Sequence, residues 1–293
     1  MPPAASTLLA IPNVSEGRDA EAIAAIGAAF TSTGARLLDT HSDPDHHRTV
    51  YTLAGAAGEL APALVAGAAA CRAWIDLRMA RGSHPLVGAL DVAPVVYLDA
   101  ADRGPACVEA LISGEDLGRT GLPVFLYGEL AGGRTRAELR RGGRMTLRDR
   151  VEAGELEPDF GPQRITAGHG AVLVAARPPL VAFNIELAPP ATIEDARRIA
   201  AAIREGGEEG LPGVRALGLV LPARDGIAQV TTNVEDHRAV ALATLVATVA
   251  RHAEVAGCEL VGLAPEAAFA GFPDDVPVRN RRTLEDALGR LSS

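Results

Sequence analysis

The order in which apolar segments follow one another constrains the fold of this 293-residue chain more than any other feature of its sequence. Short runs with alternating apolar residues are typical of strands, and longer runs with apolar residues three and four positions apart are typical of helices. These runs occur twice in the order strand, helix, strand, strand, helix, strand. Each βαββαβ unit would lay its helices on one face of a mixed sheet. The sequence therefore predicts an α+β fold of two ferredoxin-like α/β sandwich subdomains.

The two units meet at Pro178 and Pro179, and we expect two domains, residues 1–178 and 179–293. In the first unit, strands are predicted at 8–14, 36–40, 49–54 and 92–98, and helices at 20–30 and 58–79. This unit is extended by a helix at 107–118 and by strands at 124–127 and 171–176. In the second unit, strands are predicted at 180–187, 214–221, 227–233 and 259–263, and helices at 192–204 and 235–256.

Residues 129–170 interrupt this pattern, because they are rich in arginine and glycine and end in the run Pro158–Pro162. We expect a long surface excursion here, with one or two short helices. Excursions of this length are more often functional, or part of an interface, than idle.

The basic residues restrict the chemistry, because all 28 are arginines and the chain has no lysine. Schiff-base enzymes, P-loop nucleotide binders and protein kinases all need a lysine amine at a fixed place, so these classes are excluded. The net charge is −9 and aromatic residues make up 3% of the chain. Phosphate backbones require positive charge and bases require stacking partners, so we expect no nucleic-acid partner.

The sequence also predicts the compartment. No apolar run reaches the roughly 18–20 residues that a membrane helix needs, so we expect no membrane association. The first residues lack the positive stretch of a signal peptide. The three cysteines, Cys71, Cys107 and Cys258, are odd in number and widely spaced. We therefore expect reduced thiols in a cytoplasmic protein.

A first histidine cluster lies between two predicted strands, in a segment that we interpret as a polar loop. It combines His41, Asp43, Asp45, His46 and His47, which is the composition of a metal site. The spacing does not match a common metal motif, and a solvated turn capped by aspartate and proline accounts for the same residues. A metal-dependent enzyme built on this cluster stays one alternative.

A second cluster, Arg81–Pro85, contains a histidine bracketed by glycine and proline. His84 stands at the entrance to a predicted strand, where a loop can present it as a general base. The unperturbed pKa of histidine, about 6.5, suits that role. A loop histidine that only forms surface hydrogen bonds is the alternative, and spacing alone does not decide between them.

A series of segments then resembles the glutamate formiminotransferase family, in the same order and over nearly the whole chain. The matching segments are Pro12–Arg18, Leu37–Asp39, Arg48–Thr52, Ile75–Arg78, His84–Pro85, Gly88–Val92, Pro123–Tyr127, Pro158–Pro162, Ala182–Ile185, Gln229–Asn233 and Leu260–Leu263. The resemblance implies two subdomains, a homodimer, and tetrahydrofolate as co-substrate in a groove between the subdomains. It also implies transfer of a formimino group from N-formiminoglutamate to N5 of the folate, in histidine breakdown.

The resemblance assigns the catalytic base to His84. One imidazole can take the proton of the attacking nitrogen and give it to the departing glutamate nitrogen. Arginine binds carboxylates in a bidentate fork, so we expect Arg48 and Arg81 to hold those of glutamate and folate. The substrate-binding set that follows from the matching segments is Asn13, Asp39, Asp45, His47, Arg48, Arg81, Gly88, Asn184 and Glu186.

The chain departs from the family at several of these positions. The family has a second catalytic acid two residues after Asp39, where this chain has His41. In a working formiminotransferase, Asp43 or Asp45 would replace that acid. Family asparagines are replaced by His47 and Glu186. A folate- or pterin-binding paralogue with altered or lost catalysis is therefore the second reading of the same residues.

Overall fold

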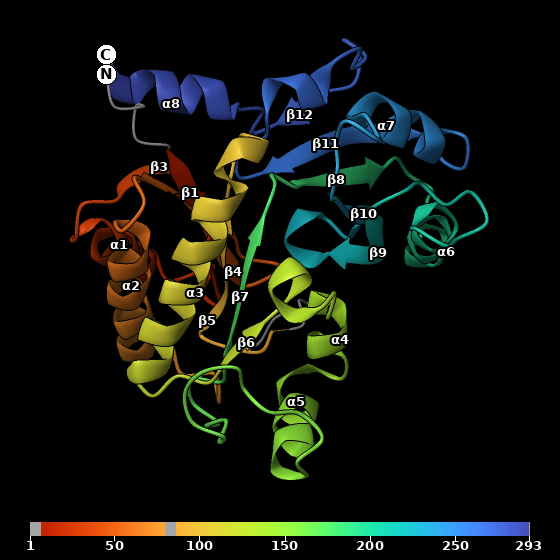
Figure 1. Cartoon of the computed structure of the whole chain (residues 1–293). Coiled ribbons are helices and arrows are strands. Elements are labelled where there is room, and N and C mark those ends of the chain that lie inside the picture. Colours follow the sequence, from red (N-terminus) through yellow and green to blue (C-terminus); the bar gives the residue numbers. More distant parts are fainter. Residues whose placement is uncertain (1–6, 80–85, 293) are drawn as a thin grey trace. The chain divides into compact units, whose positions relative to one another are not determined.

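Two units follow one another along the chain, Met1–Pro178 and Pro179–Ser293 (Figure 1). The computed structural model describes residues 7–79 and 86–292. Each unit builds its own mixed sheet and its own apolar core, which confirms the predicted α+β class. Among the described helices, none is both long enough and apolar enough to cross a membrane.

The first unit begins with the predicted βαββαβ order and continues with further elements. Its strands are β1 (Leu8–Ala10), β2 (Asn13–Val14), β3 (Arg36–Asp43), β4 (Arg48–Gly55), β5 (Leu90–Val96), β6 (Val124–Leu126) and β7 (Val172–Arg177). Its α-helices are α1 (Ala20–Thr31), α2 (Leu60–Trp74), α3 (Arg103–Arg119), α4 (Arg136–Arg140) and α5 (Gly143–Glu152). The short 3₁₀ helices η1 (Ala100–Asp102) and η2 (Gly128–Ala131) precede α3 and α4.

The strand order of the first sheet is ferredoxin-like at one side and parallel at the other. β1 and β2 together fill the place between β4 and β5, and β3 pairs with the other side of β4. These pairings are antiparallel, whereas β5, β7 and β6 run parallel to one another. The predicted strand at 8–14 is divided at Pro12, because proline has no N–H group for the ladder.

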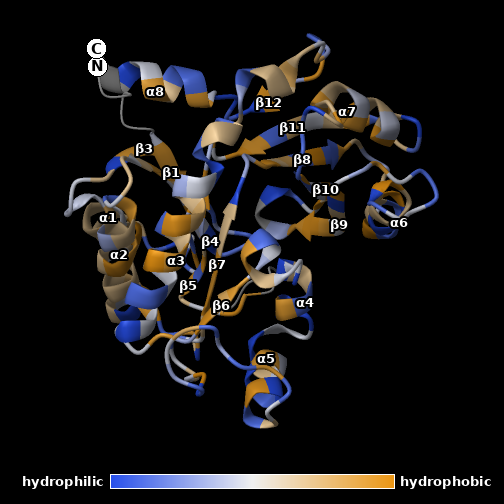
Figure 2. Ribbon diagram, in the orientation of Figure 1, coloured by the Kyte–Doolittle hydropathy of each residue, from blue (hydrophilic) through white to orange (hydrophobic). Residues whose placement is uncertain are grey.

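Helices α1, α2 and α3 bury their apolar sides in one core with the sheet. Helix α1 begins after Asp19, whose side chain accepts two backbone N–H groups of the first turn at 3.0 and 3.1 Å. Its Ile26 and Phe30 are fully buried, and the Phe30 ring lies 5.2 Å from that of Tyr51. Figure 2 shows apolar colours along β6 and β7, and mixed colours along α3.

The excursion covers the opposite face of the parallel strands. Leu139 of α4 and Leu147 of α5 are fully buried in a separate apolar cluster with residues of β5, β6 and β7. The prediction of one or two short helices in 129–170 is confirmed. Strand β4 is buried on both faces, since every residue after Arg48 in this strand is buried.

The second unit repeats the βαββαβ order and adds elements at its end. Its strands are β8 (Val181–Leu187), β9 (Val214–Leu221), β10 (Ile227–Val234), β11 (Val255–Val261) and β12 (Val278–Arg279). Its helices are α6 (Ile193–Ile203), η3 (Pro222–Arg224), α7 (Leu242–Ala250), η4 (Glu266–Phe269) and α8 (Leu284–Ser292). The sheet order is β12-β11-β8-β10-β9, antiparallel except for the β11–β12 pair.

Two predicted helices are shorter in the structure. The helix expected at 58–79 ends at Trp74, because Ile75 turns to extended backbone and the N–H of Leu77 bonds to the carbonyl oxygen of Gly168 at 2.8 Å. The helix expected at 235–256 is reduced to α7. Its predicted start is a turn in which Ala239 and Val240 donate to the carbonyl oxygen of Asp236, and its predicted end already belongs to β11.

Candidate active site

The first histidine cluster lies on a hairpin, not in a solvated loop. Strand β3 continues to Asp43, and β4 starts at Arg48, so only four residues form the turn. His41 pairs with Val50 and Asp43 pairs with Arg48 across the two strands. His41 is buried, with 6% of its surface exposed. The prediction of a polar loop from 41 to 48 is wrong at both ends, because alternating polar residues can also line one face of a strand.

Asp43 holds the turn through His46. The backbone N–H of His46 donates to Asp43 Oδ1 at 2.9 Å, and His46 Nδ1 lies 2.5 Å from Asp43 Oδ2. Burial by itself raises the pKa of Asp43, but the hydrogen bonds from His46 and the charges of His46 and Arg48 outweigh it and lower the pKa to about 2. Asp43 is therefore a partly buried carboxylate that stays ionised near neutral pH.

His47 occupies the last position of the turn in a left-handed conformation, with φ of +50°. Its Nδ1 accepts a hydrogen bond from the backbone N–H of Gly17 at 3.2 Å and lies 3.4 Å from Glu16 Oε1. Burial lowers the pKa of His47, and the charge of Arg18 lowers it further, while Glu16 opposes both. The neutral ring thus ties the hairpin to the segment that precedes α1.

Arg48 is a half-buried cation without a direct partner in the described chain. Its guanidinium makes no hydrogen bond or ion pair within residues 7–79 and 86–292, and its Nε is shielded from solvent. Burial lowers the pKa of Arg48 to about 10. The charges of Asp43 and Asp91 raise it, and those of Arg140 and Arg136 lower it. These five charged side chains therefore lie close enough to act on one another.

Asp91 and Arg140 join the sheet to the excursion. Asp91 lies in β5, is 4% exposed, and accepts the backbone N–H of Val87 at 2.7 Å. Its other oxygen accepts a hydrogen bond from Arg140 of α4. Tyr127, which follows β6, acts on the charge of Arg140, and its hydroxyl is buried without a hydrogen-bond partner in the described chain.

Sequence reasoning missed this part of the site. Asp91 stood in a segment used for the resemblance, and Arg136 and Arg140 stood in the arginine-rich excursion. The only signal was the four-residue spacing of the two arginines, which puts them on one side of a helix. Nothing local indicated that this helix packs against the sheet near Arg48.

Asn13 and Gly88 lie close to the same strands, in structural roles. Asn13 in β2 pairs with Val50 on one side and Val92 on the other, and its Nδ2 donates to the carbonyl oxygen of Ile11 at 3.1 Å. Gly88 packs against backbone, since a Cβ there would lie 1.8 Å from the carbonyl oxygen of Ala171.

Of the remaining predicted site residues of the first unit, the structure describes Asp39 and Asp45 but not Arg81 and His84. Asp39 is buried in β3, two residues before His41, on the strand face that also carries His41 and Asp43. Asp45 lies in the turn and is half-buried. His84 and Arg81 lie outside the described residues. The described residues on either side of them, Leu77 and Val87, both bond to the backbone of the segment 168–171.

Asn184 and Glu186 belong to the second unit and lie on the face of β8 that is turned away from its core. Asn184 Oδ1 accepts from Thr231 Oγ1 at 2.6 Å. Glu186 is 3% exposed and receives two hydrogen bonds from Arg279, at 2.7 and 2.8 Å, and one from Arg224. Glu186 is therefore fully engaged by two guanidinium groups of its own unit.

The residues of the first histidine cluster do not converge as metal ligands. Within the described residues there is no group of three histidine, cysteine, aspartate or glutamate side chains arranged to hold a metal ion. His46 directs Nδ1 at Asp43, and His47 uses Nδ1 to accept from Gly17. The geometry of this part of the chain thus does not support the metal-dependent alternative.

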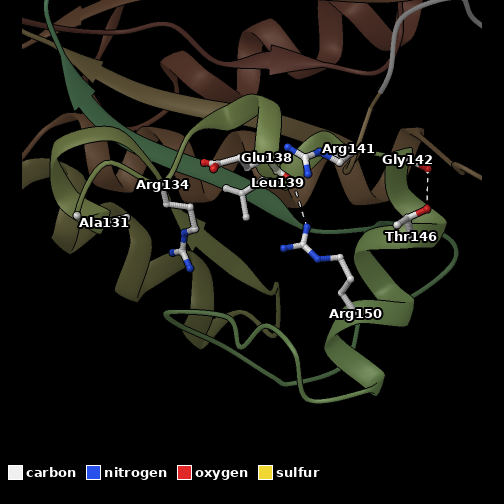
Figure 3. A pocket seen from close by; sticks show the side chains of 9 residues that line it. Ala131, Arg134, Glu138, Leu139, Arg141, Gly142, Thr146 and Arg150 are labelled. Carbon is white, nitrogen blue, oxygen red and sulfur yellow. Dashed lines mark hydrogen bonds between the residues drawn. The ribbon is translucent and has the colours of Figure 1, made fainter.

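A cavity of about 690 Å³ lies elsewhere in the excursion (Figure 3). It is lined by Ala131, Gly132, Arg134, Glu138, Leu139, Arg141, Gly142, Thr146 and Arg150. Arg150 leans from α5 toward α4, where its Nη1 donates to the carbonyl oxygen of Glu138 at 3.1 Å. Arg134 donates hydrogen bonds to the carbonyl oxygen of Leu126 and forms an ion pair with Asp159. The residues predicted for the site are not among those that line this cavity.

Comparison with known proteins gives matches to both units. Residues 7–177 match the formiminotransferase domain, N-terminal subdomain, and residues 182–272 match the formiminotransferase domain. Among solved structures, a microcompartment protein from Desulfitobacterium hafniense aligns with a TM-score of only 0.24 at 11% identity, over 88% of this chain and 94% of that one.

Named relatives support the same family. The formimidoyltransferase-cyclodeaminase of Sus scrofa is 38% identical over 272 residues, which are 87% of this chain and 49% of that protein. This chain thus spans about half the length of that relative. The glutamate formimidoyltransferases of Thermoplasma acidophilum and Streptococcus pyogenes serotype M1 are 32% and 34% identical, over 88% of this chain and 88% and 89% of theirs. This chain belongs to the formiminotransferase family.

Proposed function

We propose that this chain transfers the formimino group of N-formiminoglutamate to N5 of tetrahydrofolate. The observation that carries the proposal is the half-buried guanidinium of Arg48, which has no partner in the described chain and lies beside an ionised aspartate, in a chain that matches the family along both units. A cation that is buried without a partner is costly unless an anion compensates it. The carboxylates of the donor and of the folate are such anions.

The reaction exchanges one bond to carbon for another. Tetrahydrofolate supplies N5 as the accepting nitrogen, a bond from N5 to the formimino carbon forms, and the bond from that carbon to the glutamate nitrogen breaks. N5 loses a proton and the glutamate nitrogen gains one. We assign both transfers to His84, on the family match of the pair His84–Pro85.

Asp43 supplies the negative charge near this reaction in our proposal. Its lowered pKa keeps it ionised, and it stands two residues after His41, along the face of β3 that also carries Asp39. A fixed carboxylate stabilises the positive charge of a formimino group as it is transferred. Asp43 would thus replace the family acid whose position is taken by His41.

The test is release of glutamate from N-formiminoglutamate in the presence of tetrahydrofolate. We expect turnover by the unaltered chain, a loss of about 10²–10⁴-fold in His84→Ala, and a clear loss in Asp43→Asn. His252→Gln, which removes a histidine paired with Glu209 in the second unit, is the matched control and keeps its activity. A silent unaltered chain that becomes active in His41→Asp would instead identify a folate-binding paralogue that has lost its acid.

We further propose that the protein works as a homodimer in the cytoplasm. Support comes from α3, where Val108, Leu111 and Ile112 are exposed at helical spacing and are available to an interface. Sedimentation equilibrium tests the dimer and should give twice the mass of the chain. A single-chain mass at micromolar concentration would contradict it.

A further inference from the structure

Three guanidinium groups gather where helix α4 of the excursion meets the first sheet. Arg48 comes from β4, and Arg136 and Arg140 come from successive turns of α4. Each of the two excursion arginines acts on the charge of Arg48, and Arg136 also acts on Arg140. Like charges in a partly buried place repel one another, so this arrangement requires compensation.

The two neighbouring carboxylates, Asp91 and Asp43, are already bonded to other groups of the chain and do not provide all of this compensation. Asp91 accepts from Arg140 and from the backbone of Val87. Asp43 is bonded to His46. Both carboxylates are therefore already engaged by other groups of the chain.

Several hydrogen-bond donors at the same place are unused. The Nε atoms of Arg48 and Arg140 and the hydroxyl of Tyr127 are shielded from solvent and have no hydrogen-bond partner in the described chain. Arg136 likewise forms no hydrogen bond or ion pair with a described residue. Buried donors are nearly always satisfied in folded proteins, so these donors are available to a group with several acceptor atoms.

A ligand that suits these donors is an anion with more than one acceptor oxygen. A carboxylate fits, because it is negative and its two oxygens accept from guanidinium groups in a fork. A neutral ligand would add no negative charge beside the three guanidinium groups.

We propose that Arg48, Arg136 and the hydroxyl of Tyr127 bind one carboxylate of the formimino donor, and that this contact makes the site specific for an acidic amino acid. The proposal rests on the function proposed above and adds Arg136 and Tyr127 as specificity-determining residues. Arg140 acts as a positioning residue, because its bond to Asp91 fixes α4 against β5.

The first test measures binding without turnover. Glutarate, which carries the two carboxylates of glutamate without its amine, is titrated calorimetrically into the full chain at constant ionic strength. We expect binding to weaken about 10-fold or more in Arg136→Gln and about 3–10-fold in Tyr127→Phe, as for a lost hydrogen bond to a charged group. Tyr127→Phe keeps the ring in the core, so it reports on the hydroxyl even where Arg136→Gln lowers stability.

The matched control is Arg141→Gln. Arg141 follows Arg140 directly, has the same charge and lies in the same excursion, but it is exposed and lines the separate cavity of Figure 3. We expect this variant to bind glutarate like the unaltered chain. Equal weakening in Arg141→Gln would show a general effect of net charge and would overturn the proposal. Binding of inorganic phosphate in place of glutarate would overturn it as well.

The second test separates this proposal from the function on which it rests. In turnover of N-formiminoglutamate, Arg136→Gln should raise KM about 10-fold or more with kcat nearly unchanged, because a carboxylate contact serves ground and transition states alike. An active enzyme whose KM ignores Arg136 and Tyr127 would overturn the specificity proposal and leave the activity standing. If glutarate binding depends on Arg136 in a chain without turnover, the carboxylate site stands and the proposed activity is overturned.

Discussion

The Nδ1 atom of His47 accepts a hydrogen bond from the backbone N–H of Gly17, at 3.2 Å. This contact joins the β3–β4 turn to the segment that leads into α1. An imidazole nitrogen accepts only when it carries no proton, so the contact requires the neutral ring. Protonation of His47 at this atom would break the hydrogen bond and place two donors opposite each other.

The first prediction concerns stability below pH 7. Because burial lowers the pKa of His47 in the folded chain, the unfolded chain binds this proton first, at its ordinary pKa near 6.5. Stability is therefore complete above this value and is lost as the pH falls toward the lower pKa of the folded state. We expect the thermal midpoint to decrease between pH 7 and pH 5, measured by circular dichroism in buffers of constant ionic strength.

His47→Asn tests the residue behind that decrease. Asparagine adopts positive φ more readily than most residues, and its Oδ1 can accept the same N–H without titrating. The variant should fold and show a smaller loss of stability between pH 7 and pH 5. Part of the loss should persist, because the pKa of His237 is also lowered, by burial and by Arg238. An unchanged pH profile would show that His47 is not a source of the effect.

The second prediction concerns the start of α2. Glu109 of α3 is 2% exposed, and its carboxylate accepts the backbone N–H groups of Gly58, Leu60 and Ala61 at 2.7, 3.0 and 2.8 Å. One side chain from another helix thus caps the first turn of α2. Glu109→Ala should lower the free energy of unfolding by about 2–4 kcal/mol, since several buried donors lose a charged acceptor.

Urea unfolding of the full chain measures this loss. Glu115→Ala is the control on the same helix, because Glu115 is exposed and pairs with Arg119 on the surface. Its effect should stay within about 0.5 kcal/mol. Equal effects of the two substitutions would mean that the cap contributes nothing beyond an exposed ion pair.

The third prediction concerns Gly88, which the family resemblance placed in the substrate-binding set. In the structure a Cβ at this position would lie 1.8 Å from the carbonyl oxygen of Ala171 and 2.6 Å from that of Leu90. Both obstacles are backbone and cannot rotate away. Gly88→Ala should therefore destabilise the first unit by about 3 kcal/mol or more, seen as a lower urea midpoint. A stable Gly88→Ala chain with impaired substrate binding would return the residue to the binding set.

Local patterns predicted the order of the elements well, because the periods of strands and helices depend on neighbouring residues. The βαββαβ order of both units is present, and the excursion has its short helices. The ends of elements were predicted less well. The alternation of Asp39, His41 and Asp43 is a strand pattern, but the polar character of these residues favoured a loop. Strand β12 and helix α8 had no predicted counterpart.

The candidate site shows where sequence reasoning stops. Asp43 and Arg48 could be selected because they are close in sequence and flank one turn. Arg136, Arg140 and Tyr127 could not, since they reach the same place only when α4 packs on the far side of the sheet. Long-range packing of this kind has no local periodicity, so the arginine-rich excursion could be recognised but not placed.

The fourth prediction concerns Glu186, a buried carboxylate held by two arginines. Arg279 binds both of its oxygens, and Arg224 reaches the same carboxylate from the turn after β9. Removing one partner of a buried ion pair costs about 3–5 kcal/mol, because the other charge is left uncompensated. Arg224 and Arg279 keep contact with water, with side chains 38% and 37% exposed, so we expect a smaller loss of about 2 kcal/mol in Glu186→Gln.

The double variant Glu186→Gln with Arg279→Gln separates coupling from general damage. If the ion pair is the source of the loss, the double variant should lose less than the sum of the two single variants, as measured by urea unfolding. Glu194→Gln on α6, whose carboxylate is in no hydrogen bond or ion pair with a described residue, is the control and should have little effect. Strictly additive losses would contradict the coupling, and Glu186 would then act through packing of β8 alone.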